Sequence, residues 1–231
     1  EITTRLVGSE MCIRDSNEGE WVLLNGNQTA LMFVYYLITR WKELGKINGK
    51  EYIVKTIVTT ETIKTIAERN GVEMYDVYTG FKWIANVMRE NEGKKNYIGG
   101  GEESYGFLCE DFVRDKDAVS ACVILAEIAA WAKDQGLSLY QLLQKIYVEY
   151  GFSKEKGISV VKKGKSGAEE IEAMMKKFRE NPLTEIAGSK VTYFYDYSTL
   201  KGKDYAENET VTLDMPTTSN AVSYTHLRAH E

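Results

Sequence analysis

Histidine is the scarcest reactive residue in this chain of 231 residues. The only two, His226 and His230, lie at its C-terminal end, so the rest of the chain has no histidine base, triad or zinc ligand. Cysteine is also rare, and its three residues have neither metal-ligand spacing nor the pattern of a disulfide framework. This usage is typical of a reducing compartment, and we expect a cytoplasmic protein.

Long apolar runs and an excess of basic residues are absent as well. No apolar stretch approaches the length of a membrane span. The 29 basic and 34 acidic residues give a net charge of −5, so the composition does not indicate a nucleic-acid or membrane surface. We therefore expect neither nucleic acid nor a membrane as a partner.

The two ends of the chain are related to each other. Val222–Glu231 can be encoded by a DNA whose reverse complement encodes Leu6–Asp15. Selection on a protein does not produce this relation, whereas ligating one adapter to both ends of a DNA fragment does. Both stretches also resemble the translated transposase adapter of short-read sequencing. We interpret residues 1–16 and 222–231 as non-native and expect an internal piece of a longer protein between them.

Residues 17–150 alternate between strand and helix patterns. This alternation predicts an α/β domain with a mixed, mostly parallel sheet and helices on both faces. In such open sheets, ligands bind at the carboxyl ends of the strands, where loops lead into helices. The strands are predicted at 21–24, 52–58, 74–78 and 96–99, and helices are predicted after each of them.

Residues 151–221 have a different pattern of predicted strands and helices, which predicts the first part of a smaller α+β domain. Gly157–Lys165 has the pattern of a basic strand. Ser166 and Glu169 then have capping-box spacing at the start of a helix. Gly188–Tyr197 predicts a second strand, and we expect the remaining strands of this domain to lie beyond the chain.

The stretch IGGGEESYGF, from Ile98 to Phe107, is the most informative loop. Its three glycines allow positive φ angles and close approach of backbone to a ligand. Glu102 can accept hydrogen bonds from neighbouring sugar hydroxyls, and Ser104 can both donate and accept. On the residues alone, an acidic surface turn is the more common explanation. In either case we expect the Glu102 carboxylate to be exposed.

Two further loops carry groups that could bind an anion, namely backbone N–H groups and positively charged side chains. Thr79 and Gly80 lie between a predicted strand and a helix start, where the helix dipole attracts anions, and Lys82 follows. Arg114 and Lys116 precede the long predicted helix. Taken singly, these are more often an ordinary helix start and a solvated charged face. The earlier loop NGNQTA, from Asn25 to Ala30, is interpreted as a turn that caps its helix.

In combination, TGFKW, GGEESYG and RDKD resemble the phosphoglucomutase/phosphomannomutase family of α-D-phosphohexomutases. The resemblance extends from LLNGNQTA through KGKSGAEEI to DMPTTSN. It implies an enzyme of four domains around one cleft, of which 17–150 would be the third, sugar-binding domain. Residues 151–221 would begin the C-terminal domain.

The resemblance also implies a function: an isomerase that moves phosphate between C1 and C6 of a hexose phosphate through a glucose 1,6-bisphosphate intermediate. Substrate-binding residues would be Glu102, Ser104, Thr79, Gly80, Lys82 and Lys116. Mg²⁺ would be bound in the parent enzyme by a DGDxDR-type loop that this chain lacks, as it lacks the phosphoserine motif and the terminal phosphate loop. We therefore expect no catalytic residue, no metal site and no mutase activity in this chain. A phosphomannomutase or phosphopentomutase, or a non-catalytic sugar-phosphate-binding protein, are the alternatives.

Overall fold

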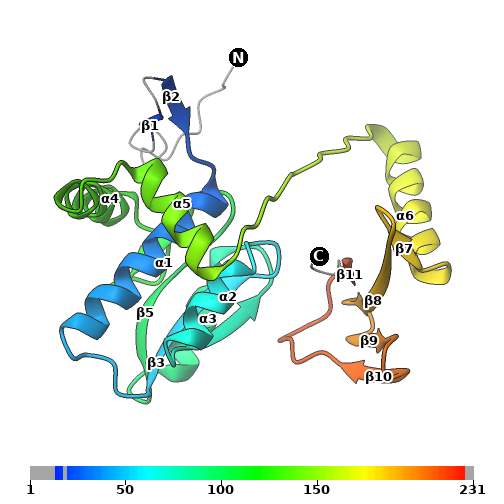
Figure 1. The fold of residues 1–231 in the computed structure, drawn as a ribbon. Helices are drawn as coiled ribbons and strands as arrows, with labels where there is room; N and C mark the ends of the chain where they lie inside the picture. The colour runs from blue at the N-terminus through cyan, green and yellow to red at the C-terminus, as the bar shows by residue number, and fades with distance from the viewer. Residues whose placement is uncertain (1–13, 18–19, 227–231) are drawn as a thin grey trace. The chain divides into compact units, whose positions relative to one another are not determined.

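The computed structural model describes residues 14–17 and 20–226, and the chain divides between Lys156 and Gly157 into two compact units (Figure 1). A short hairpin precedes the main sheet of the first unit. It pairs β1 (Arg14–Asn17) with β2 (Glu20–Leu23) in antiparallel fashion. Three of its eight strand residues, Arg14 to Ser16, lie within the segment predicted to be non-native.

The first unit is built on a sheet of four strands. These are β3 (Glu51–Thr56), β4 (Glu73–Val77), β5 (Asn96–Gly101) and β6 (Phe107–Cys109), in the spatial order β4-β3-β5-β6. Strand β3 is parallel to both β4 and β5, and only β6 is antiparallel to its neighbour. The predicted mixed, mostly parallel sheet is therefore confirmed.

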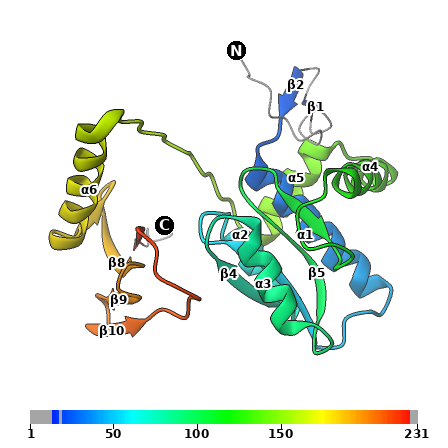
Figure 2. The same cartoon turned by 180° about the vertical axis from the view of Figure 1, so that it is seen from behind.

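Helices cover both faces of this sheet (Figures 1 and 2). Strand residues alternate between two separate cores: Ile53 packs with the first core, and its neighbours Tyr52 and Val54 pack with the second. The second core contains α3 (Phe81–Asn91). The larger first core contains α1 (Gly26–Glu43), α2 (Thr62–Arg69), α4 (Ala118–Asp134) and α5 (Leu139–Tyr150).

Side-chain caps fix where these helices begin. Asn25 and Gln28 form a reciprocal capping box at the start of α1, which confirms the interpretation of NGNQTA as a capping turn. Asp117 caps α4 by accepting a hydrogen bond from the Ser120 N–H at 2.8 Å. Ser138 and Gln141 form a second capping box at α5.

Several predicted boundaries in the first unit are wrong. The strand predicted to run to Val58 ends at Thr56. The chain turns there, and the Thr59 N–H donates a hydrogen bond to the Thr56 carbonyl. Strand β6 was not predicted at all. The glycines Gly99–Gly101 lie inside β5 without positive φ, and their missing side chains instead leave room for neighbours such as Phe107.

The second unit packs one helix with an antiparallel sheet. The sheet contains β7 (Glu185–Ile186), β8 (Ser189–Asp196), β9 (Lys201–Asp204), β10 (Glu209–Thr212) and β11 (Val222–His226). Its strand order is β10-β9-β8-β11, and β7 also pairs with β8. Arg179 of α6 (Gly164–Glu180) donates to Asp196 of β8 at 3.0 Å and links the helix to the sheet.

Two predictions for the second unit are wrong. Gly157–Lys165 is not a strand: residues 157–163 pair with no strand among the described residues, and α6 begins at Gly164. A strand is stable only where a neighbour completes its backbone hydrogen bonds. Ser166 and Glu169 do not form the helix cap, because α6 begins two residues earlier, with Lys163 at the N-cap position.

Candidate sugar-phosphate site

All six candidate residues lie at or near the carboxyl ends of β4 and β5. Thr79 and Gly80 follow β4, and Glu102 and Ser104 follow β5. These two strands both run parallel to β3, so their carboxyl ends lie at the same end of the sheet. Lys82 lies in the first turn of α3 and Lys116 just before α4. Figure 2 shows α3 beside these strands.

A hydrogen bond joins the two loops directly. The Gly80 N–H donates to Glu102 Oε1 at 2.9 Å. Gly80 has a φ of 114°, a conformation that favours glycine, and this conformation presents its N–H to the carboxylate. Glu102 is only 6% exposed, so the expectation of an exposed carboxylate is wrong. Its position is fixed by the neighbouring loop.

Lys116 reaches the same place from the other side of Gly106. A Cβ added to Gly106 would lie 2.8 Å from Glu102 Oε2 and 3.0 Å from Lys116 Cδ. Lys116 Nζ also lies 5.9 Å from the ring centroid of Phe81, the first residue of α3. The structure therefore brings Glu102, Gly80 and Lys116 together, and the missing Gly106 side chain permits their close approach.

The other three candidates have exposed polar groups. Thr79, Lys82 and Ser104 are exposed, and none of their side chains makes a hydrogen bond or ion pair with the residues that the structure describes. Lys82 Nζ lies 4.9 Å from the ring centroid of Trp83. Their polar groups can therefore bind a ligand without first breaking an internal contact.

Hydrogen bonds between distant parts of the chain hold these loops in place. Thr56 Oγ1, at the end of β3, donates to Glu103 Oε2 at 3.0 Å. The Thr60 N–H donates to Asn27 Oδ1 at 2.9 Å, which joins the next loop to the start of α1. Each bond connects residues more than thirty positions apart, so no local pattern could reveal it.

A buried lysine, Lys55, lies near the carboxyl end of β3, at the same end of the sheet. Lys55 is 1% exposed, and its Nζ lies 2.6 Å from Asp76 Oδ1 and 2.7 Å from Glu61 Oε1. It also donates to the carbonyl of Thr59 at 3.3 Å. Burial raises the pKa of Asp76, and the positive charge of Lys55 opposes that rise. The lysine links β3, β4 and the loop that leads to α2.

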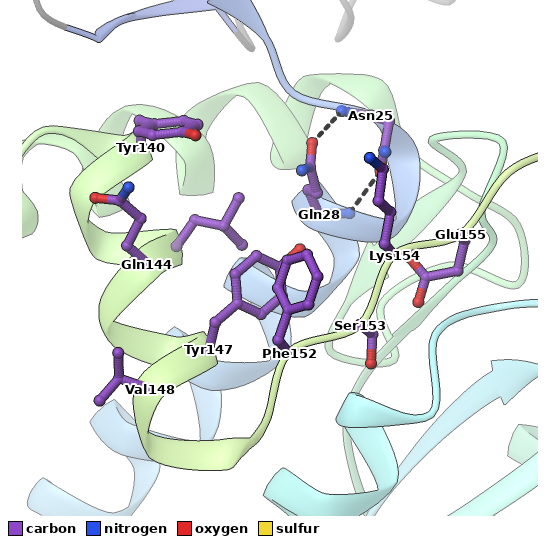
Figure 3. A pocket seen from close by; sticks show the side chains of 11 residues that line it. Asn25, Gln28, Tyr140, Gln144, Tyr147, Val148, Phe152, Ser153, Lys154 and Glu155 are labelled. Carbon is purple, nitrogen blue, oxygen red and sulfur yellow. Dashed lines mark hydrogen bonds between the residues drawn. The ribbon is translucent and has the colours of Figure 1, made fainter. Parts of the chain in front are cut away.

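The first unit contains several hollows of ligand size. One, of about 570 Å³, contains the candidate residue Lys82. Another, of about 700 Å³, is shown in Figure 3. It lies against α5 and contains none of the six candidates. Its aromatic side chains, Tyr140, Tyr147 and Phe152, are surrounded by polar groups from the start of α1 and from residues 153–155.

The described residues offer no metal site: residues 14–17 and 20–226 contain no group of three or more His, Cys, Asp or Glu side chains that could hold a metal ion. No helix within the same residues is long and apolar enough to span a bilayer.

A mostly parallel α/β sheet with helices on both faces, and candidate residues where its strands end, defines the class of open-sheet α/β domains, which bind ligands at the carboxyl ends of their strands. Residues 25–150 match the family described as "Phosphoglucomutase/phosphomannomutase, alpha/beta/alpha domain III". This chain therefore belongs to the phosphoglucomutase/phosphomannomutase family.

Individual relatives agree with this assignment. A phosphoglucomutase of Staphylococcus haemolyticus is 34% identical over 197 residues, covering 85% of this chain and 35% of the relative. A phosphoglucomutase of Staphylococcus aureus is 37% identical over 201 residues, covering 87% and 34%. The chain thus spans about a third of these relatives. A crystal structure of the phosphoglucomutase parafusin from Paramecium shares the fold, with a TM-score of 0.51 at 15% identity over 90% of this chain and 33% of that one.

Proposed function

We propose that this chain is part of a phosphoglucomutase-type isomerase, which moves a phosphate between C1 and C6 of a hexose through a bisphosphate intermediate. The supporting observation is the hydrogen bond from Gly80 to Glu102, which joins two loops of the family motif at one edge of the sheet. Within that enzyme, this chain recognises the hydroxyls and the phosphate of the sugar.

Four of the six candidate residues have side chains whose environments suit a role in binding. Glu102 uses one lone pair of Oε1 for Gly80, and the remaining lone pairs of its carboxylate can accept hydrogen bonds from adjacent sugar hydroxyls. Ser104 adds an exposed hydroxyl beside it. Lys82 and Lys116 place positive charge where phosphate groups approach. Phosphoryl transfer depends mainly on positioning and charge neutralisation, so these contributions are the ones the reaction needs.

The remaining machinery is proposed to lie in other parts of the parent protein. This includes the residue that carries the transferred phosphate and the loop that binds Mg²⁺. We also propose that residues 1–16 and 222–231 are not native to the enzyme. The alignments with the two staphylococcal relatives span 197 and 201 residues, close to the length left when both end segments are removed.

The test uses the full-length parent enzyme with Glu102→Gln. The amide oxygen can still accept the Gly80 N–H, so the fold should be preserved, whereas the negative charge and half of the acceptor capacity are lost. We expect kcat/KM for glucose 1-phosphate to fall about 100-fold, which corresponds to roughly 2.7 kcal/mol of transition-state stabilisation.

Glu110→Gln is the matched control, because Glu110 is an exposed carboxylate of the same domain that follows β6 and lies outside the candidate site. Its activity should match that of the unmodified enzyme. Activity of Glu102→Gln within a few-fold of that control would contradict the role proposed for Glu102. Circular dichroism of both variants checks that neither effect arises from unfolding.

A further inference from the structure

The hollow of about 570 Å³ is formed by one face of α3 and a loop that passes over it. It is lined by Lys82, Ala85, Asn86, Arg89, Glu92 and Arg114, and is called here the α3 hollow. Lys82, Ala85, Asn86 and Arg89 have the spacing i, i+3, i+4 and i+7, which places them on one side of the helix. The small side chain of Ala85 leaves space between the longer ones.

Arg114 completes the hollow from the loop between β6 and α4. One of its nitrogens, Nη1, donates to the carbonyl of Asp111 at 3.0 Å, and Nη2 lies 3.3 Å from Glu92 Oε1. These two contacts hold the guanidinium group against the end of α3. The sequence places Arg114 beside Lys116 before α4, and in the structure its side chain lines the α3 hollow.

The charges of the α3 hollow are unbalanced. Three cations face one carboxylate, Glu92, which is already paired with Arg114. Within the described part of the chain, no carboxylate lies within ion-pair distance of Lys82 or Arg89. Arg89 Nη2 donates to Asn86 Oδ1 at 2.9 Å, which orients its guanidinium group. A preoriented guanidinium group with unused donors favours binding of an anion with several oxygen atoms.

We propose that the α3 hollow is an accessory site for a small molecule that carries phosphate groups. Guanidinium groups match the geometry of phosphate oxygens, and the volume of the hollow lies within the range that holds small ligands. The site goes beyond the proposed function, because Arg89 lies outside the motifs TGFKW, GGEESYG and RDKD, and Arg114, although it begins RDKD, is not among the proposed substrate-binding residues. Lys82 is common to both sites.

Inorganic phosphate and pyrophosphate are the probes for this site. Each is titrated into the ¹⁵N-labelled chain at low ionic strength, and amide shifts are followed around Ala85, Arg89 and Arg114. We expect saturable shifts in the millimolar range, with pyrophosphate binding more tightly. Arg89→Gln and Arg114→Gln should each weaken binding about tenfold, as expected for the loss of one charge-assisted hydrogen bond.

Lys64→Gln is the control, because it removes one exposed positive charge from α2, outside the hollow. The proposal is overturned if the unmodified chain shows no saturable shifts up to about 20 mM, well above a millimolar dissociation constant. It is also overturned if Lys64→Gln weakens binding as much as the arginine variants do, because the attraction would then be diffuse.

A second measurement separates this site from the proposed function. Glu102→Gln should leave the phosphate titration unchanged, since Glu102 lies outside the hollow. In the full-length parent the same variant tests sugar recognition. Loss of the phosphate shifts on Glu102→Gln would refute a separate site. Unchanged activity of Glu102→Gln in the parent would refute the sugar role and leave the α3 hollow standing.

Discussion

Backbone N–H groups that donate hydrogen bonds to individual carboxylates determine the environment of those carboxylates in this domain. Glu102 follows a glycine-rich strand end and would be expected in solvent from its sequence context alone. In the structure it is buried, and the Gly80 N–H, from a loop twenty-two residues away, donates to it and offsets the cost of removing the carboxylate from water. Its identity as a candidate could be predicted from the motif, but its environment depends on a contact between distant loops.

Glu51 leads to a prediction about pH. Burial alone would raise the pKa of this carboxyl, but hydrogen bonds from the Asn96 side chain and from the N–H groups of Asn48 and Gly49 together outweigh it, so the pKa lies below its ordinary value. The unfolded chain therefore binds the proton more tightly. The contribution of Glu51 to stability is complete above the unfolded value of about 4.3 and is lost as pH falls through the lower folded value.

The measurement is urea unfolding as a function of pH. Glu51→Gln should lower the free energy of unfolding by about 1 kcal/mol at pH 7 and should flatten the decline seen in acid. Glu68→Gln, which changes an exposed carboxyl of α2, should leave that decline unchanged. If both variants decline like the unmodified chain, Glu51 does not supply the acid-labile contribution.

At the scale of secondary structure, elements with strong periodicity could be predicted and those that depend on partners could not. The alternation of residues such as Tyr52 and Ile53 between two cores produces the pattern that identifies β3. Strand β6 has only three residues and exists because β5 lies beside it. Gly157–Lys165 has an apolar pattern but no strand to pair with among the described residues.

Lys55 connects three elements and supports a prediction about their stability. Lys55→Met should destabilise the first unit by about 2 kcal/mol, because it leaves the Asp76 carboxylate without its partner. This figure is below the range for a fully buried pair, since about a third of the Asp76 side chain is exposed. Urea unfolding followed by tryptophan fluorescence measures the change.

Two companion variants test that explanation. Adding Asp76→Asn to Lys55→Met should recover part of the lost stability, since it removes the unpaired charge. Lys64→Met, at an exposed position of α2, should change stability by less than about 0.5 kcal/mol. Equal destabilisation by Lys55→Met and Lys64→Met would show that the ion pair contributes nothing.

At the scale of the whole chain, one strand of the second unit comes from the segment proposed to be non-native. Val222–His226, within the segment proposed to be non-native, pairs with β8 as strand β11. Most of that pairing uses backbone groups, which any extended segment can supply. Tyr224 adds a hydrogen bond from its hydroxyl to the Phe178 carbonyl at 2.8 Å. Pairing of this kind is therefore compatible with an adapter-derived strand and does not show that it is native.

The last prediction concerns activity of the chain by itself. Transfer of a phosphate requires the donor group, the metal and the sugar to be held together, and such positioning accounts for many orders of magnitude in rate. The described residues are proposed to supply sugar and phosphate contacts, and they contain no group of three or more His, Cys, Asp or Glu side chains that could hold a metal ion. We therefore expect the purified chain to show no interconversion of glucose 1-phosphate and glucose 6-phosphate in a coupled assay, with the full-length parent as the positive control. Turnover that increases in proportion to chain concentration, and persists after repurification, would mean that these residues contain a complete catalytic site.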